Sequence, residues 1–154
     1  MTDDQKNITK LLNELEIETY KQFITGKKIM EIKGKLTNYT TSIPNVSILS
    51  LVDLQLMLNK INSNANKVSS LHPFENYELA KKLDSMSLDA FVYSSSFNST
   101  SRAISDAAIK AVYGLDANQI NALFGIMYVN SGGSFEKLTL ADKGCAQEKS
   151  KLNK

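Results

Sequence analysis

The sequence contains a single cysteine, Cys145, and a single histidine, His72, among 154 residues. A lone thiol cannot form an intrachain disulfide, and one cysteine and one histidine far apart in the chain do not make a zinc site. This cysteine usage favours a reducing, intracellular compartment, although it does not indicate which one. His72 precedes a proline, and no Gly-x-Ser-x-Gly elbow supplies it with a nucleophile, so a surface or structural role is favoured over catalysis.

Long apolar runs and phosphate-binding motifs are also missing. No stretch reaches the roughly 18 apolar residues of a membrane helix, and the acidic start has no apolar core of a secretory signal behind it. Neither Gly-x-Gly-x-x-Gly nor Gly-Lys-Ser/Thr occurs. The net charge of +2 gives no electrostatic case for nucleic acid or an acidic membrane surface. We therefore expect a soluble protein with neither a nucleic-acid nor a membrane partner.

The spacing of apolar residues predicts one α+β domain that is mostly helical. A length of 154 residues fits a single core, and 42% hydrophobic residues is ordinary for a globular chain. Short strands are expected near 17–20 and in a hairpin over 28–39 that turns at Gly34. About five helices are predicted: over 3–15, from Ser47 onward, after Ser87, over 102–113, and across 120–131.

Two of these helices carry apolar stripes that we take as their buried faces. The first consists of Leu51, Leu54, Leu58 and Ile61, and the pattern then fades into a polar run at 62–66 that is typical of a loop or a frayed end. The second consists of Ile120, Leu123, Phe124 and Met127, and it stops before two glycines.

Few side chains in the sequence could take part in catalysis or ligand binding. Glu14, Glu16 and Glu18 cluster where a helix gives way to a strand, which is most simply a solvated edge. Gly132-Gly133 is explained by a helix C-terminus as well as by a ligand loop. The residues taken by themselves therefore indicate a mostly helical domain with no catalytic residue and no metal site.

Two sequence motifs near the end of the chain give more information about its fold and function. The run from Asn121 to Gly133 resembles the pattern Ala-Leu-aromatic-x-Leu-x-Tyr-x-x-x-Gly-Gly of flavin-containing monoamine oxidases. About ten residues later, Gly144-Cys145-Ala146-Gln147-Glu148 is similar to their Gly-Gly-Ala-Gln-Glu element. The order and spacing of the two elements make the resemblance fairly specific. It extends backward, in the same order, through Leu83–Ser87, His72–Phe74, Lys33–Lys35 and Asn13–Tyr20.

The resemblance implies the fold of the substrate-binding domain of these enzymes, which forms much of their amine cavity. By alignment, residues of the helix over 102–113 would line that cavity together with the segment after Gly133, and Gln147 would approach the flavin and the amine. The alternative is that the helix residues are ordinary core. The implied substrate-binding residues are Ile104, Ala108, Ala111, Val112, Leu138, Thr139 and Gln147.

The family's flavin fingerprint, active-site lysine and flavin-linking cysteine have no counterpart in this sequence. Cys145 also replaces the second glycine of the Gly-Gly-Ala-Gln element, which puts the local geometry there in doubt. We therefore expect a substrate-binding domain over 1–148 and a basic tail over 149–154, with no cofactor bound to this chain, whereas the full-length relatives use FAD. Such a chain is an excised or truncated part of an amine oxidase, or alternatively a free-standing, non-catalytic binding module.

The resemblance also implies partners. In a full-length context the ligand is a small amine. Without the flavin-bearing half, the groove between the helix over 102–113 and the segment after Gly133 would be open and apolar, so self-association through it is expected.

Overall fold

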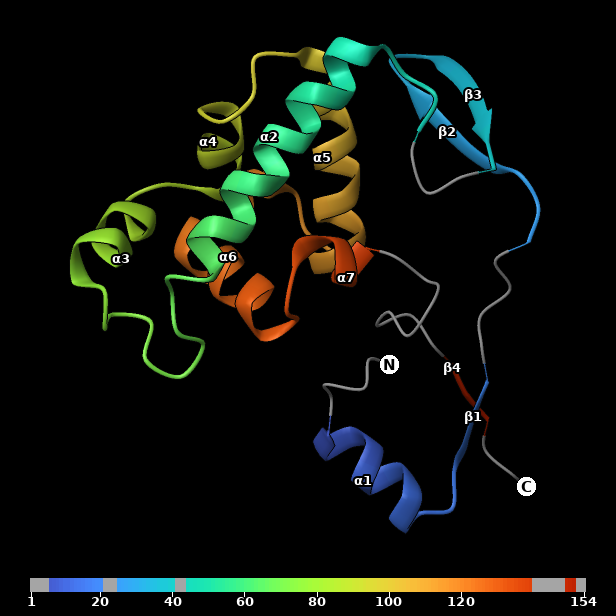
Figure 1. The fold of residues 1–154 in the computed structure, drawn as a ribbon, viewed down its shortest axis with the longest axis vertical. Helices are drawn as coiled ribbons and strands as arrows, with labels where there is room; N and C mark the ends of the chain where they lie inside the picture. The colour runs from blue at the N-terminus through green and yellow to red at the C-terminus, as the bar shows by residue number, and fades with distance from the viewer. Residues whose placement is uncertain (1–5, 21–24, 41–43, 140–148, 152–154) are drawn as a thin grey trace.

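The computed structural model describes residues 6–20, 25–40, 44–139 and 149–151. Within them lie seven α-helices, a 3-10 turn and four short strands, which pair as two separate two-stranded antiparallel sheets (Figure 1). The mostly helical α+β class is confirmed, with seven α-helices rather than five. The elements are α1 (Lys6–Glu14), β1 (Glu18–Tyr20), β2 (Lys28–Ile32), β3 (Lys35–Tyr39), α2 (Ile48–Ala65), α3 (Tyr77–Asp84), α4 (Leu88–Tyr93), α5 (Ser99–Tyr113), η1 (Ala117–Gln119), α6 (Ala122–Ser131), α7 (Phe135–Thr139) and β4 (Lys149–Lys151).

A bundle of helices holds the core. The long helix α2 packs against α5 and α6, and α6 also contacts α3 and α4. The side chains that these helices share are apolar and almost fully buried, as the hydrophobic effect requires of a core. Its members include Met57, Ile61, Leu83, Phe91, Ile109, Ile126 and Val129. None of the described helices is long and apolar enough to span a bilayer.

The predicted hairpin is confirmed. Strands β2 and β3 pair from Lys28 opposite Tyr39 to Ile32 opposite Lys35. The two turn residues, Lys33 and Gly34, have φ of 52° and 75°, the pattern of a type I′ turn, whose twist suits a two-residue hairpin. The ammonium of Lys33 then donates to the Ser99 hydroxyl at 2.6 Å, which attaches the turn to the start of α5.

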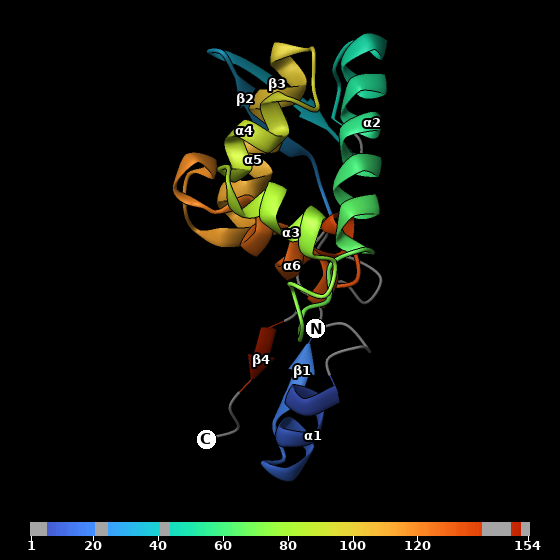
Figure 2. The same ribbon diagram turned by 90° about the vertical axis from the view of Figure 1, so that its left-hand side faces the viewer.

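Helix α1 and a small ribbon lie at one end of the molecule, away from the helical body (Figures 1 and 2). Strand β1 pairs with β4, so that Glu18 lies opposite Lys151 although the two are distant in the sequence. Residues 149–151, which fall in the expected basic tail, thus form a strand.

Local signals placed the start of α2 correctly, but its end was predicted wrongly. The Ser47 hydroxyl accepts from the Ser50 amide and caps the helix, as predicted. The polar run after Ile61, however, remains helical to Ala65. Two of its groups bond to other elements: the Asn62 side-chain amide donates to the Glu136 carboxylate, and the Ala65 carbonyl accepts from the Asn130 side chain. Tertiary partners therefore keep this polar turn folded.

The predicted stripes were also partly wrong. Leu51, Leu54 and Leu58 on α2 are only half-buried, and Phe124 on α6 is exposed. Helix α3, which the prediction omitted, is capped by the Asn76 side chain and buries one short face against the core. The faces that are buried consist of Ser50, Asp53, Met57, Ile61 and Ala65 on α2, and of Ala122, Leu123, Gly125, Ile126 and Val129 on α6.

Candidate functional site

Helix α5 carries four of the predicted site residues. It begins three residues earlier than predicted, at Ser99, and ends as predicted at Gly114, which takes a left-handed φ of 70°. Ile104, Ala108 and Ala111 follow at intervals of four and three, which places them along one edge of the helix. Ile104 is buried, Ala108 is half-buried and Ala111 is exposed, so this edge leads from the interior to the surface.

Val112 lies between this edge and the core. It and Ala108 pack against the hydrophobic core cluster, so both belong in part to the core, as the alternative interpretation holds. Ile104 lies outside that cluster although it is buried. The edge formed by Ile104, Ala108 and Ala111, which we call the α5 edge, is therefore the part of the predicted set that can border a cavity.

Two further predicted residues lie on α7, which contacts α5. Leu138 is buried in the core cluster, and Thr139 is half-buried with its hydroxyl donating to the Glu136 carbonyl at 3.1 Å. The fold thus brings together six of the seven predicted residues on two adjacent helices. Gln147 and the element around Cys145 lie outside the described residues.

The glycine pair between α6 and α7 has a packing function. Gly133 has a φ of 84°, which favours glycine. Gly132 has an ordinary φ of −87°, but a Cβ there would collide with the Leu138 side chain, 2.8 Å from its Cγ. The absence of a side chain at Gly132 therefore allows Leu138 to reach its position beside α6.

Replacing Gly132 with alanine is expected to lower the free energy of unfolding by about 1–3 kcal/mol, because overpacking forces neighbouring side chains to shift. Adding Leu138→Ala should remove the collision, so the double variant should lose less than the two single losses combined. Urea denaturation of the four proteins measures this coupling, and additive losses would show that the two side chains do not interfere.

A buried carboxylate fixes the start of α5. Asp53 on α2 is fully buried. It accepts hydrogen bonds from the Ser96 hydroxyl and from the backbone N–H groups of Phe97 and Asn98, the last two at 3.1 and 3.0 Å. Burial raises the pKa of Asp53, but these hydrogen bonds outweigh that effect, so its pKa lies below the ordinary 3.8.

Further polar pairs connect α2 to α5 beyond this carboxylate. The Ser101 hydroxyl donates to the Ser50 carbonyl at 2.9 Å, and the Ser50 hydroxyl donates to the Asn98 side chain at 3.2 Å. The Ser105 hydroxyl lies 3.1 Å from the Met57 sulfur. Sliding or rotating α5 would leave these buried groups without partners, which is costly. The polar contacts therefore determine which edge of α5 faces away from α2.

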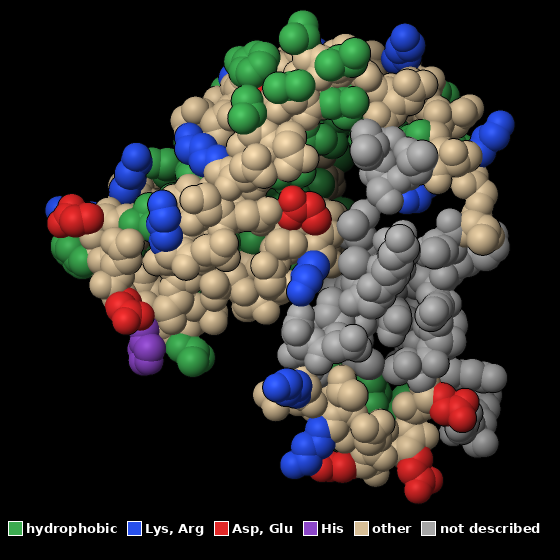
Figure 3. Space-filling model, viewed as in Figure 1, with side chains coloured by type: hydrophobic (Ala, Val, Ile, Leu, Met, Phe, Trp, Pro, Cys, Tyr) green, Lys and Arg blue, Asp and Glu red, His purple; other side chains and the backbone are tan. Residues whose placement is uncertain are grey.

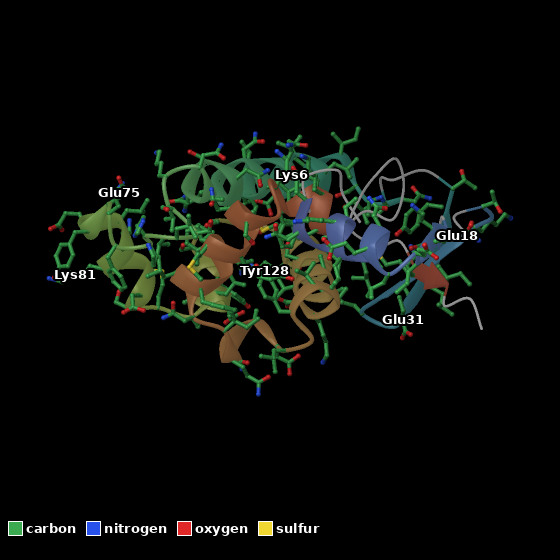
Figure 4. The ribbon with its side chains drawn as sticks, turned by 90° about the horizontal axis from the view of Figure 1, so that it is seen from below. Lys6, Glu18, Glu31, Glu75, Lys81 and Tyr128 are labelled. Carbon is green, nitrogen blue, oxygen red and sulfur yellow. The ribbon has the colours of Figure 1, made fainter. Side chains whose placement is uncertain are left out.

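Aromatic side chains join the end of α5 to α6. The Tyr113 hydroxyl donates to the Gly125 carbonyl at 2.8 Å, and its ring lies 5.2 Å from that of Tyr128 between centroids. Burial raises the pKa of Tyr113 far above its ordinary value, and Tyr128 adds to the shift. Figure 4 shows Tyr128 on α6 beside α5. This contact anchors the outer end of the helix that carries the α5 edge.

A separate depression lies on α1 and does not include any predicted site residue. Its lining side chains all come from one helix, so polar groups from different elements do not converge there as they do in ligand sites. We assign it no ligand. It is lined by Lys6, Thr9, Lys10, Asn13 and Glu14.

The described residues offer no group of three or more His, Cys, Asp or Glu side chains that could hold a metal ion. They also offer no strand that runs through a glycine-rich turn into a helix, the arrangement that holds a dinucleotide pyrophosphate. We assign none of the described residues to flavin binding.

No family model matches the sequence. Individual proteins do match it over nearly its whole length. A Mycobacterium tuberculosis protein named flavin-containing monoamine oxidase AofH is 23% identical over 145 residues, which is 94% of this chain and 32% of the relative. A Dictyostelium discoideum protein named flavin-containing monoamine oxidase A is 21% identical over 150 residues, covering 97% and 33%. The resemblance indicated by the sequence motifs is therefore confirmed.

Solved structures share the fold. Putrescine oxidase bound to putrescine superposes with a TM-score of 0.84 at 20% identity, over 97% of this chain and 33% of that one. Cyclohexylamine oxidase from Brevibacterium oxydans gives a TM-score of 0.78 at 14% identity, over 94% and 32%. The chain thus spans about a third of the length of the relatives and structures it matches, and its fold is that of one part of flavin amine oxidases.

Proposed function

We propose that this chain forms the substrate-binding part of a flavin-dependent amine oxidase, with the α5 edge and α7 as walls of the amine pocket. The observation that carries the proposal is the match of 97% of the chain, in fold, to putrescine oxidase. The placement of α7 against α5 supports it, because the residues that the alignment assigns to the cavity come to lie on adjacent helices.

The chemistry of these walls suits an amine with an apolar body. Small side chains at Ala108 and Ala111 leave room beside the helix, and the neighbouring Ile104 is apolar as well. The predicted residues on the described walls carry no charge, and Thr139 supplies the one polar side chain among them. The resemblance assigns the approach to the amine to Gln147. When FAD is bound in the complete enzymes, it accepts the hydride.

Amine binding is tested by titrating the isotope-labelled chain with putrescine and with cyclohexylamine, followed by NMR. We expect chemical-shift changes concentrated on α5 and α7, at the edge residues and at Leu138 and Thr139. Ala111→Phe should abolish these changes, because the larger ring fills the space beside the α5 edge. Ala90→Phe, at an exposed alanine on α4, serves as the matched control and should leave the titration unchanged.

Two outcomes would contradict the proposal. Shifts spread evenly over the charged surface would indicate non-specific binding of a cation. Shifts that persist in Ala111→Phe would show that the amine binds elsewhere, and the free-standing binding module would then become the better description.

A further inference from the structure

Helix α7 is too short to hold its position by itself. It has five residues, Phe135–Thr139, and a helix of this length gains little stability from its own hydrogen bonds. Its place beside α5 therefore depends on contacts with other elements. The side chains of Phe135 and Leu138 supply the buried contacts, since both belong to the core cluster. Figure 3 shows mostly polar and charged side chains over α7 and the neighbouring end of α2, so the outer side of this contact is polar.

The half-buried side chain of Asn62, on α2, binds the first turn of α7. Its Oδ1 accepts from the backbone N–H of Phe135 at 3.1 Å, and amides at a helix start have no partner within the helix. Its Nδ2 donates to the two carboxylate oxygens of Glu136, at 3.1 and 2.8 Å. Only a side chain with both an acceptor and a donor can make these bonds, as an amide does. Asn62 thus fixes the direction of α7 as well as its position.

The contacts of Asn62 continue to the wall of the proposed pocket. The backbone carbonyl of Glu136 accepts from the Thr139 hydroxyl at 3.1 Å. Thr139 and Leu138 are the residues of α7 that the alignment assigns to the amine cavity, and α7 contacts α5, which carries the other wall. A helix of five residues is only about 7.5 Å long. A shift at its first turn therefore displaces Thr139 relative to the α5 edge.

A separate hydrogen bond holds the end of α6. The Asn130 side chain donates to the Ala65 carbonyl at 3.0 Å, so α6 is attached to the last turn of α2 without the help of Asn62. Loss of the Asn62 bonds would therefore release the start of α7 while α6 keeps its own contact with α2.

We propose that Asn62 is a positioning residue for the amine pocket: by holding Phe135 and Glu136, it sets the distance between Thr139 and the α5 edge. The inference rests on the amine pocket proposed above. Asn62 acts through Glu136 and Thr139 rather than by contact with the amine. Without its bonds, α7 occupies the binding-competent position in a smaller fraction of the molecules, and the apparent affinity for an amine falls with that fraction.

Titration of the 154-residue chain and its variants with putrescine, followed by NMR, tests this role. Asn62→Asp keeps the acceptor for Phe135 but places a second carboxylate against Glu136. The Kd for putrescine should rise at least about tenfold, because like-charge repulsion replaces a hydrogen bond to a charged group. Adding Glu136→Gln restores a donor opposite an acceptor, with the two roles exchanged. The double variant should bind with a Kd within about threefold of that of the parent chain.

Asn59→Asp is the matched control. It places the same negative charge on an exposed position of α2, three residues before Asn62, and should leave the Kd unchanged. The control separates the positioning effect from the attraction of a diammonium ion to any added carboxylate. Circular dichroism confirms that each variant is folded. If Asn62→Asp does not fold, Asn62→Ala replaces it in the test, since alanine removes both bonds, adds no charge and favours a helix.

The other outcomes overturn the inference in distinguishable ways. A parent chain that shows no shifts on α5 and α7 with putrescine would remove the amine pocket, and the role of Asn62 with it. A parent chain that binds putrescine no more tightly than folded Asn62→Asp or Asn62→Ala would refute the positioning role alone and leave the pocket in place. A folded double variant that stays as weak as Asn62→Asp would show that the effect does not pass through Glu136.

Discussion

Replacing Asp53 with alanine is expected to lower the free energy of unfolding by about 3–5 kcal/mol. The substitution removes a fully buried acceptor and leaves the backbone N–H groups of Phe97 and Asn98 without a partner. Buried polar groups that lose their partner cost about 1–3 kcal/mol each, and more where a charge was involved. Urea denaturation at neutral pH measures the loss. Glu75→Ala, at an exposed carboxylate, is the control and should change stability by less than about 0.5 kcal/mol.

The same carboxylate should make stability depend on pH in a defined direction. The folded pKa of Asp53 is lower than its ordinary value of 3.8. The stability it contributes is therefore present above the ordinary pKa and is lost as the pH falls through the folded pKa. The difference in unfolding free energy between the parent chain and Asp53→Asn should shrink as the pH drops below about 4. A difference that grows on acidification would contradict the assigned direction.

Replacing Leu123 with alanine should cost about 2–5 kcal/mol, whereas the same change at its neighbour Phe124 should cost less than about 1 kcal/mol. Leu123 is 5% exposed and belongs to the core cluster, while Phe124 is 51% exposed. The centroid of the Phe124 ring lies 6.4 Å from the centroid of the Tyr128 ring. The two denaturation midpoints, measured side by side, determine the buried face of α6.

Equal losses at the two positions would show that the face of α6 has been assigned wrongly. Such a result would also weaken the placement of α7, because the turn through Gly132 that positions Leu138 continues directly from α6. The pair of variants therefore tests the position of α7, on which the candidate site depends, as well as the packing of the core.

The sequence was sufficient to predict the backbone conformation where hydrogen bonds and turn residues within a few positions determine it. The Ser47 cap needs only a hydroxyl and the amide three residues later. The hairpin turn needs only residues that tolerate a positive φ, which Gly34 does at no steric cost. Gly114 ends α5 for the same reason. Each of these signals lies within a few residues and does not depend on distant contacts.

The face that each helix buries could not be predicted in the same way. On α2 the leucine spacing indicated Leu51, Leu54 and Leu58, yet the buried face contains Asp53 and Ser50. Counting apolar residues cannot identify a buried carboxylate, because its burial is tolerated only when the turn before α5 supplies three donors. Those donors come from residues 96–98, more than forty positions away.

The same distinction between local and distant contacts applies to the candidate site. The sequence by itself determined the mostly helical class and the caps and turns, and it indicated the resemblance to amine oxidases, whose alignment predicts the set of site residues on α5 and α7. Only the tertiary structure decided that Val112 and Leu138 pack in the core while Ala111 is exposed, and that β1 pairs with β4. The physical reason is that caps and turns are satisfied locally, whereas burial and strand pairing depend on groups that are distant in the chain.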